Sequence, residues 1–524
     1  MEGAQAQSSG TTGVKQTLGL TGATVNAMAL IAPGAFLWIT YQLQASAAAP
    51  NGTSVAKDMW PGIFLALIIA MLSAISYSEL ARRYPEAGFG SCYYFAEKAF
   101  VDRENAEHHK WARLAKIITG WAAHLYYWVY PGTMVAFMAT LVGYIYNQVT
   151  GNTMSFTALI VFSIAFALLT GAIAVRGITG STVTAAVINI IQLMTLIGFT
   201  ILAIVYRLTD AGGPNKWTFA SPSDILLPHS FQGLLIQSTL AILILVGFES
   251  CTALAAETKD PTRNIPRAVI LSLVIQGAFA YLFEYFGANL MLSDKLTGVD
   301  AHKAAVTGMD AAAASSAPIG DMAIVVGNTV LHSIGFGLMI TIAVTVVIAL
   351  LGTTLSCINT AARVSYAMSK DREMPELLGM LHGKFASPAR AIWALMIVSC
   401  VIAVIGVKSV VGLTGITLAS NFGTFALYGL TCLWTLVAFA GEPGSSFVKH
   451  KVVPALGLVA NVGMLVSIIY LYIIGGADSK TEAYICFGIA FAWAAVSALY
   501  VILNSVRRGH PLIGKVRRAN SGAA

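Results

Sequence analysis

The sequence predicts an all-α integral membrane protein with twelve membrane-spanning helices. Hydrophobic residues make up 57% of the chain and charged residues only 10%, whereas soluble domains carry about 25% charged residues. The apolar residues gather into twelve runs, most of them near or above the roughly 20 residues that a helix needs to cross a bilayer. The connecting loops are short, and no soluble catalytic domain fits between them.

The expected spans divide the chain into five parts. A tail of residues 1–17 precedes a first group of five spans within 18–230, a second group of five within 231–440, and two final spans within 441–507; a short basic tail covers 508–524. The first apolar run is longer than a signal-peptide core and many more follow it, so we expect no cleavage. In chain order the spans are 18–43, 59–83, 117–148, 155–175, 181–207, 231–256, 268–292, 328–362, 389–407, 410–439, 452–475 and 482–505.

The basic residues predict the orientation. An even number of spans places both termini on one side of the membrane. If that side is the cytoplasm, 24 of the 31 Lys and Arg residues lie in cytoplasmic segments and 7 in outer loops, as the positive-inside rule requires. We therefore expect a plasma-membrane protein with both termini inside. Its basic side chains face lipid headgroups, which leaves no concentrated surface for nucleic acid.

The first span is interrupted at its centre. The stretch "IAPGAF" (31–36) places Pro33 and Gly34 in the middle of the run. Proline removes a backbone donor and glycine adds conformational freedom, so the helix is expected to break where water cannot satisfy its peptide groups. The alternative is a simple kink within a packed helix, because neighbouring helices often satisfy such groups.

A second interruption occurs in the sixth span. Its centre carries Gly247 beside the ionisable Glu249. If the first five and the next five spans are repeats of opposite topology, the two breaks occupy equivalent positions, which marks a binding site at mid-membrane. Amides freed at Gly34 and Ala35 suit an anionic group, and the carbonyls before Pro33 suit an ammonium. The predicted substrate-binding residues are Ala32, Pro33, Gly34, Ala35, Phe36, Tyr130, Val246, Gly247, Phe248 and Glu249.

Three cytoplasmic stretches carry a family resemblance: "SYSELARRYPEAGFGSCYYF" (76–95), "GFESCTALAAETKDPTRNIPRA" (247–268) and "RVSYAMSKDREMPELL" (363–378). They resemble signatures of the amino acid, polyamine and organocation (APC) permeases. The resemblance implies a five-plus-five inverted repeat with two additional carboxyl-terminal helices, and secondary transport of amino acids or related amines. Phe248 resembles the family position whose aromatic ring caps the substrate, although packing is the simpler role.

Four residues are candidates for ion coupling. Glu249 and Glu284 are costly at membrane depth unless they are protonated, paired or hydrogen-bonded. Glu249 could equally serve a structural role. His124 has a pKa suited to proton transfer, although a buried histidine often has only a packing role. Gln192 stands where a lysine commonly aligns in proton-coupled relatives. Because a neutral amide cannot titrate, exchange or a different proton carrier is expected.

Polar residues in the eighth span raise sodium coupling as an alternative. Hydroxyl and amide side chains lie near where sodium-coupled relatives of the fold bind their ion, but hydroxyls also serve as packing contacts between helices. They are Thr353, Thr354, Ser356, Asn359 and Thr360. The six cysteines are scattered singly and show no metal-ligand spacing, so we expect reduced packing residues, no metal and no cofactor.

Three function classes are compared. The first is a transporter of amino acids by exchange or proton-linked symport. With only Glu249 and Glu284 deep in the membrane, neutral substrates are favoured over a polyamine or cationic amine. The second is a sensor that binds an amino acid without moving it, and the short carboxyl-terminal tail argues against it. The third is an enzyme or ATP-driven pump, for which the chain has neither a nucleophile-and-base arrangement nor a phosphate-binding loop.

Overall fold

The computed structural model describes residues 16–102, 108–177, 182–209, 223, 226–291, 294–300, 302–385, 387–509 and 511–513. It is almost entirely helical, and twelve of its helices are long and apolar enough to cross a membrane. The prediction of an all-α membrane protein with twelve spans is therefore confirmed. The five-plus-five repeat stays a prediction.

The long helices follow one another with short connections. Their bounds, with those of the short elements, are as follows: α1 (Leu20–Ile31), α2 (Pro33–Ser46), η1 (Ala56–Asp58), α3 (Met59–Arg83), η2 (Pro85–Gly90), α4 (Cys92–Val101), η3 (His108–Trp111), α5 (Ala112–Thr150), α6 (Phe156–Val175), α7 (Thr182–Leu208), α9 (Phe231–Ala241), η6 (Ile242–Ile244), η7 (Phe248–Glu257), α10 (Pro261–Met291), β1 (Thr297–Val299), β2 (Ala305–Thr307), α11 (Gly308–Ala314), α12 (Pro318–Val330), α13 (Gly335–Lys370), η8 (Glu376–Gly379), α14 (Ala389–Gly406), α15 (Val410–Ala438), η9 (Val448–Val452), α16 (Val453–Ile473) and α17 (Ala477–Arg508).

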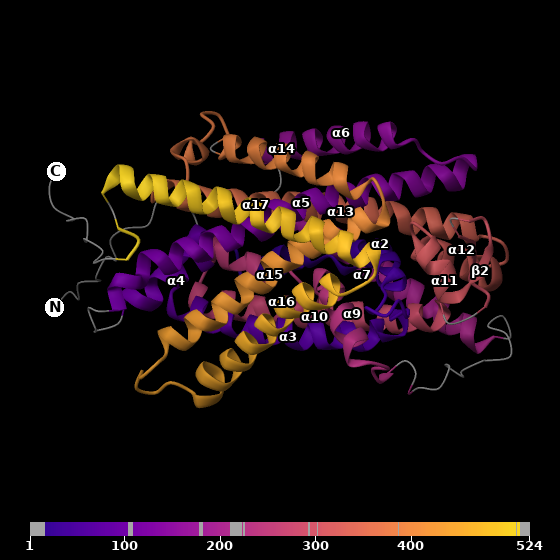
Figure 1. The fold of residues 1–524 in the computed structure, drawn as a ribbon, viewed down its shortest axis with the longest axis horizontal. Coiled ribbons are helices and arrows are strands. Elements are labelled where there is room, and N and C mark those ends of the chain that lie inside the picture. The colour runs from indigo at the N-terminus through magenta and orange to yellow at the C-terminus, as the bar shows by residue number, and fades with distance from the viewer. Residues whose placement is uncertain are drawn as a thin grey trace, which may run out of the picture.

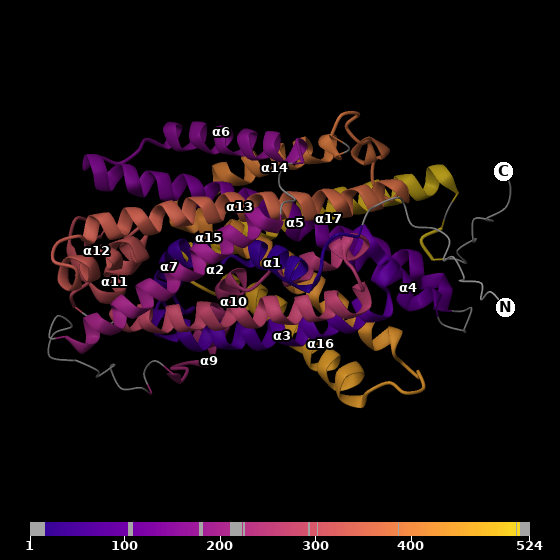
Figure 2. The ribbon, with the colours of Figure 1, turned by 180° about the vertical axis from the view of Figure 1, so that it is seen from behind.

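The helices form an elongated bundle with two distinct ends. Figure 1 shows α4 at one end, which we call the α4 end, and α11, α12 and β2 at the other, which we call the hairpin end. From behind, α1, α2 and α10 lie in the middle of the bundle (Figure 2). Most side chains of α1 and α2 are buried, so the two halves of the first span occupy the interior of the bundle.

Peripheral helices carry the surface suited to lipid. Large apolar side chains are exposed on α6 and α17, for example Val161 at 61% and Phe491 at 76%. A soluble protein rarely exposes so much contiguous apolar surface, whereas lipid tails cover it without penalty.

Three features differ from the expected boundaries. The seventh span, α10, begins at Pro261 rather than 268, because a proline is well tolerated in the first helical turn. The eighth, α13, begins at Gly335 rather than 328, since the preceding residues belong to α12. Between these spans lies an antiparallel hairpin of β1 and β2, which the sequence analysis did not predict.

Candidate functional site

The first span breaks at Ala32. This residue adopts φ 35° and ψ 58°, which is left-handed backbone, and α2 begins directly after it with Pro33 at its first position. The Ala32 amide donates to the Met28 carbonyl at 3.1 Å, and its own carbonyl accepts the Ala35 amide at 3.0 Å. The break is thus compact. The left-handed residue is the alanine before the proline, at a conformational cost of roughly 1–2 kcal/mol.

The sixth span breaks at Gly247. After α9 the chain tightens into η6, reaches Gly247 at φ +122°, and continues as the 3₁₀ helix η7. A Cβ on Gly247 would lie 2.9 Å from the amide nitrogen of Ile31 and 3.0 Å from the carbonyl carbon of Leu30. Only glycine permits both this φ and this contact. The two breaks therefore touch, backbone against backbone.

The carboxylate of Glu249 holds the second break in shape. Its oxygens accept hydrogen bonds from the Gly247 amide at 3.1 Å, the Tyr428 hydroxyl at 2.7 Å and the Tyr127 hydroxyl at 3.3 Å. The residue is 1% exposed. In the described part of the chain it forms no ion pair, so these three donors, rather than a cation, stabilise it.

The aromatic residues divide between the two sides of the breaks. Phe248 packs on Tyr77 and Tyr428, with ring centroids 6.1 and 5.1 Å away, so it faces α3 and α15. Phe36 on α2 and Tyr130 on α5 lie beside the first break, with their ring centroids 5.7 Å apart. Phe36 and Tyr130 thus form an aromatic pair beside α1, and the capping role of Phe248 stays a prediction.

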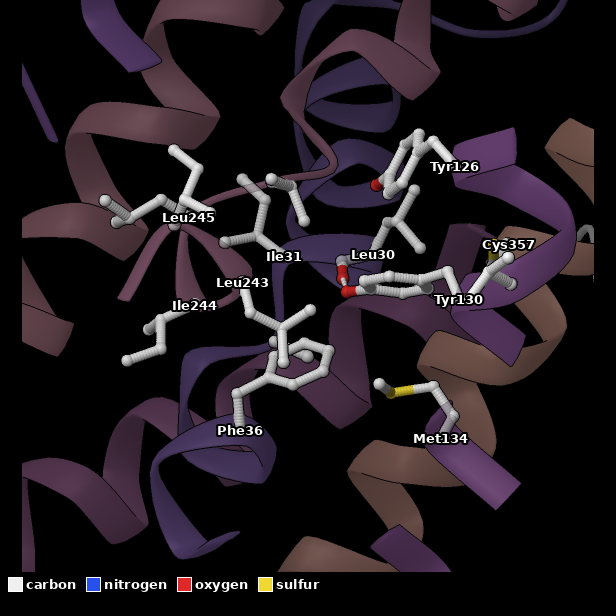
Figure 3. Packing of buried hydrophobic residues seen from close by; sticks show 14 of the residues in the cluster. Leu30, Ile31, Phe36, Tyr126, Tyr130, Met134, Leu243, Ile244, Leu245 and Cys357 are labelled. Atoms are coloured by element: carbon white, nitrogen blue, oxygen red, sulfur yellow. Dashed lines mark hydrogen bonds between the residues drawn. The ribbon is translucent and has the colours of Figure 1, made fainter. Parts of the chain in front are cut away.

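An apolar cluster fills the space around the breaks. Figure 3 shows side chains from the two broken helices facing residues of α5 and α13, and the Tyr130 hydroxyl pointing at the Leu30 backbone. That hydroxyl donates to the Leu30 carbonyl at 3.5 Å. The cluster is fully buried, so a solute can enter only after these side chains separate. It includes Leu30, Ile31, Phe36, Tyr126, Tyr130, Met134, Leu243, Ile244, Leu245 and Cys357.

Neutral side chains satisfy the carbonyls near the end of α1. Asn189 donates to Val25 at 3.1 Å, Gln276 donates to Met28 at 3.2 Å, and Thr353 donates to Ala29 at 3.0 Å. Asn189 and Gln276 also hydrogen-bond each other. Sequence reasoning had pointed to Gln192 and missed Asn189, although Asn189 is an equally visible amide one turn earlier on α7.

Gln192 instead lies beside Gly34. Both of its amide atoms are buried and find no hydrogen-bond partner among the residues the structure describes. A Cβ on Gly34 would meet the Gln192 Oε1 at 3.7 Å and Leu196 at 3.6 Å, which are ordinary contacts. Gly34 therefore faces α7, while its amide, near the start of α2, lacks an acceptor within the helix. The cavity between them holds only about 20 Å³.

The other coupling candidates lie away from the breaks. His124 is 1% exposed, and its Nδ1 and Nε2 lie 2.7 Å from the Gly120 carbonyl and 2.8 Å from the Ser365 hydroxyl. Both ring nitrogens therefore have partners, as in a packed core histidine. Glu284 is fully buried towards the hairpin end, where its Oε1 accepts a hydrogen bond from Gln44 at 2.8 Å.

The two ends of the bundle differ in how they are closed. At the α4 end, Arg363 pairs with Glu257 at 2.7 Å, which ties α13 to η7. At the hairpin end, a cavity of about 790 Å³ opens between α5, the hairpin and α12. Its lining includes Asp321, whose carboxylate accepts the Tyr144 hydroxyl at 2.8 Å. Burial raises the pKa of the Asp321 carboxyl.

The sequence matches known proteins over most of its length. The profile of a family described as amino acid permease covers residues 16–492. The methylthioribose transporter of Bacillus subtilis is 23% identical over 486 residues, covering 89% of this chain and 90% of that protein. The branched-chain amino acid permease BcaP of Lactococcus lactis is 26% identical, and the match covers 67% of this chain and 70% of that protein. The low-affinity putrescine importer PlaP of Escherichia coli is 23% identical and covers 62% of each chain.

Proposed function

Because the chain belongs to the amino acid permease family, we propose that it is a secondary transporter that moves an amino acid across the plasma membrane by alternating access. The observation that carries this proposal is the contact between the two helix breaks, where Gly247 packs directly on the backbone of Leu30 and Ile31. A solute held there contacts both broken helices at once, so its binding is linked to their movement.

The backbone groups at the breaks suit a zwitterion. The amide of Gly34 points from the amino-terminal end of α2, where the helix dipole favours a carboxylate. The carbonyl-bearing end of α1 favours an ammonium group. A substrate with one carboxylate and one ammonium close together therefore satisfies both half-helices, as an α-amino acid does.

The side chains around the breaks favour an apolar amino acid. The surrounding cluster is composed mainly of leucine, isoleucine and aromatic residues. Glu249, the one carboxylate at the break, already accepts three hydrogen bonds, so it offers little to a second ammonium group. One relative is named a branched-chain amino acid permease, which supports an apolar amino acid as the substrate. The putrescine importer among the relatives makes a diamine the natural competitor to test.

We propose substrate exchange as the mode of transport. The carbonyls near the end of α1 are satisfied by Asn189, Gln276 and Thr353, all neutral, so this region needs no inorganic cation. The proposed orientation places both termini and the α4 end in the cytoplasm, in accord with the distribution of Lys and Arg. The hairpin end and its cavity then face outward.

Counterflow into proteoliposomes tests this function. Vesicles loaded with unlabelled leucine should accumulate labelled leucine without a sodium or pH gradient, whereas empty vesicles should not. Labelled putrescine should accumulate far less. No counterflow for any amino acid would contradict the proposal and favour a binding protein that does not transport.

A further inference from the structure

A buried polar cluster near the hairpin end joins α2 to α10 on one side and to α9 on the other. Gln44 on α2 donates its side-chain amide to Glu284 Oε1 on α10 at 2.8 Å. Gln237 on α9 donates to the Gln44 carbonyl at 2.7 Å and to the Val55 carbonyl at 3.0 Å. Tyr41 adds a bond from its hydroxyl to the Glu284 carbonyl at 2.7 Å. The hairpin-end half of the first span is thus bonded to the carboxyl-bearing helix α10, and the hairpin-end half of the sixth span is bonded to α2.

The cluster lacks donors. Glu284, Gln44 and Gln237 are each 0% exposed. One side-chain oxygen of each, namely Glu284 Oε2, Gln44 Oε1 and Gln237 Oε1, finds no hydrogen-bond partner among the described residues. A buried acceptor without a donor costs free energy, and a buried carboxylate without a cation costs considerably more. An ionised Glu284 is therefore poorly accommodated in this closed arrangement.

No neighbouring charge compensates Glu284 in the part of the chain that the structure describes. Tyr281 on its own helix and Tyr41 on α2 are the nearby titratable side chains. α1 and α9 carry no titratable side chain. No ion pair joins Glu284 to the titratable groups of the other elements packed on α10. Those groups are Tyr77, Glu79, Arg82, Arg83, Tyr206, Arg207, Glu249, Cys251, Glu257, Asp310 and Asp321.

We propose that Glu284 is a proton-binding site that locks the outward side of the protein. The inference rests on the proposed function, because opening towards the hairpin end requires α2 to move away from α10. The neutral Glu284 keeps the cluster uncharged and supplies an O–H donor. The cluster can therefore stay closed without water. The ionised carboxylate of Glu284 is stable only when it is hydrated. Water can reach it only when α2 separates from α10. Because Glu284 lies near the hairpin end, its proton exchanges with the solution on the outer side of the membrane. The proton is not transported across the membrane.

The pH dependence of counterflow tests the proposal. Leucine counterflow is measured in proteoliposomes with equal pH inside and outside, so the direction of insertion does not matter. For the wild type we expect faster exchange as pH rises, with a change of at most about tenfold per pH unit, because one proton controls the lock. Glu284→Gln copies the neutral acid. It should exchange at the slow acidic rate at every pH.

Two further variants make the result interpretable. Glu284→Ala removes both the charge and the bond to Gln44, so it should exchange at the fast rate at every pH. Glu482→Gln removes a carboxyl from α17, a helix that packs on α15, α16 and α5, and should keep the wild-type profile. A normal pH profile in Glu284→Gln or Glu284→Ala, or a flat profile in the wild type, overturns the inference while the proposed function stands. Absence of counterflow in every protein at every pH contradicts the proposed function, and this inference with it.

Discussion

The two ends of the bundle are closed by different chemistry. At the α4 end the contacts are ion pairs: Arg363 with Glu257 at 2.7 Å, and Lys116 with Asp371 at 3.0 Å. Near the hairpin end, α2 is joined to α10 and to α9 by amide hydrogen bonds, one of which is to the carboxyl of Glu284. An ion pair with both partners present responds to salt and to charge reversal, whereas an unpaired carboxyl responds to pH. Each end can therefore be perturbed alone.

The largest effect is expected at Gly247, between the two ends, where the two helix breaks meet. In Gly247→Ala the added methyl group would lie 2.9 Å from the Ile31 nitrogen, on backbone that cannot give way, and φ +122° is unfavourable for alanine. We expect counterflow to be abolished and the melting temperature to fall. Gly198→Ala on α7, where a Cβ meets open space, is the matched control and should behave as the wild type. Normal transport by Gly247→Ala would show that the breaks do not need this contact.

The next largest effect is expected from the two tyrosine hydroxyls that hydrogen-bond to Glu249. Tyr428→Phe removes the 2.7 Å bond to Oε2, and Tyr127→Phe removes the 3.3 Å bond to Oε1. A hydrogen bond to a charged group contributes about 1.5–3 kcal/mol, so Tyr428→Phe should lower the stability of the protein more than Tyr127→Phe. Thermal unfolding in detergent measures both. Equal effects would indicate that Glu249 is not held by these hydroxyls.

A charge swap tests the α4 end. Arg363→Glu places two carboxylates together and should destabilise the closed state, and Glu257→Arg should do the same with two cations. The double variant restores the pair, with an expected coupling of about 1 kcal/mol for a partly exposed pair. Counterflow rates and melting temperatures in low and high salt measure the coupling, which should shrink in high salt. Strictly additive effects would mean that the pair does not close this end.

The pH response of the outer cavity should be smaller. Burial raises the pKa of Asp321, so the folded protein binds its proton more tightly than the unfolded chain does. The sign follows directly: stability falls as pH rises from the ordinary aspartate range through the raised pKa. Melting temperatures at about pH 5 and about pH 8 should differ less in Asp321→Asn than in the wild type. An unchanged difference would assign the pH response elsewhere.

The smallest effect is expected at Gly34. A methyl group there meets Leu196 and Gln192 at 3.6 and 3.7 Å, which are normal packing distances. Gly34→Ala keeps the backbone amide and should transport within about threefold of the wild type, since alanine also favours the helix. Loss of counterflow would place the substrate against the Gly34 Cα itself, on the side facing α7.

Much of the fold was predictable because a bilayer imposes long apolar helices. The twelve runs of the sequence became twelve candidate spans. The hairpin of β1 and β2 was not predictable, because strands of three residues carry too little pattern. The seventh span was expected to start at 268, whereas α10 starts seven residues earlier, at Pro261, and includes Pro266 within the helix.

The two helix breaks were predictable in position, but the orientation of the residues around them was not. Pro33 and Gly247 marked both breaks to within a residue or two. The direction of Gly34 towards α7, and of Phe248 towards Tyr77, depends on how each helix is rotated against distant segments. The same holds for Asn189, which reaches Val25 although Gln192 does not. Such contacts come from three-dimensional packing, and one sequence does not encode them as a local pattern.

The most direct test is a cryo-electron microscopy structure of the protein with bound leucine. The account predicts density for the amino acid between the two breaks, with its carboxylate near the amide of Gly34 and its side chain among Phe36, Tyr130 and Leu243. Continuous, unbroken first and sixth spans, or leucine bound only in the cavity at the hairpin end, would contradict it.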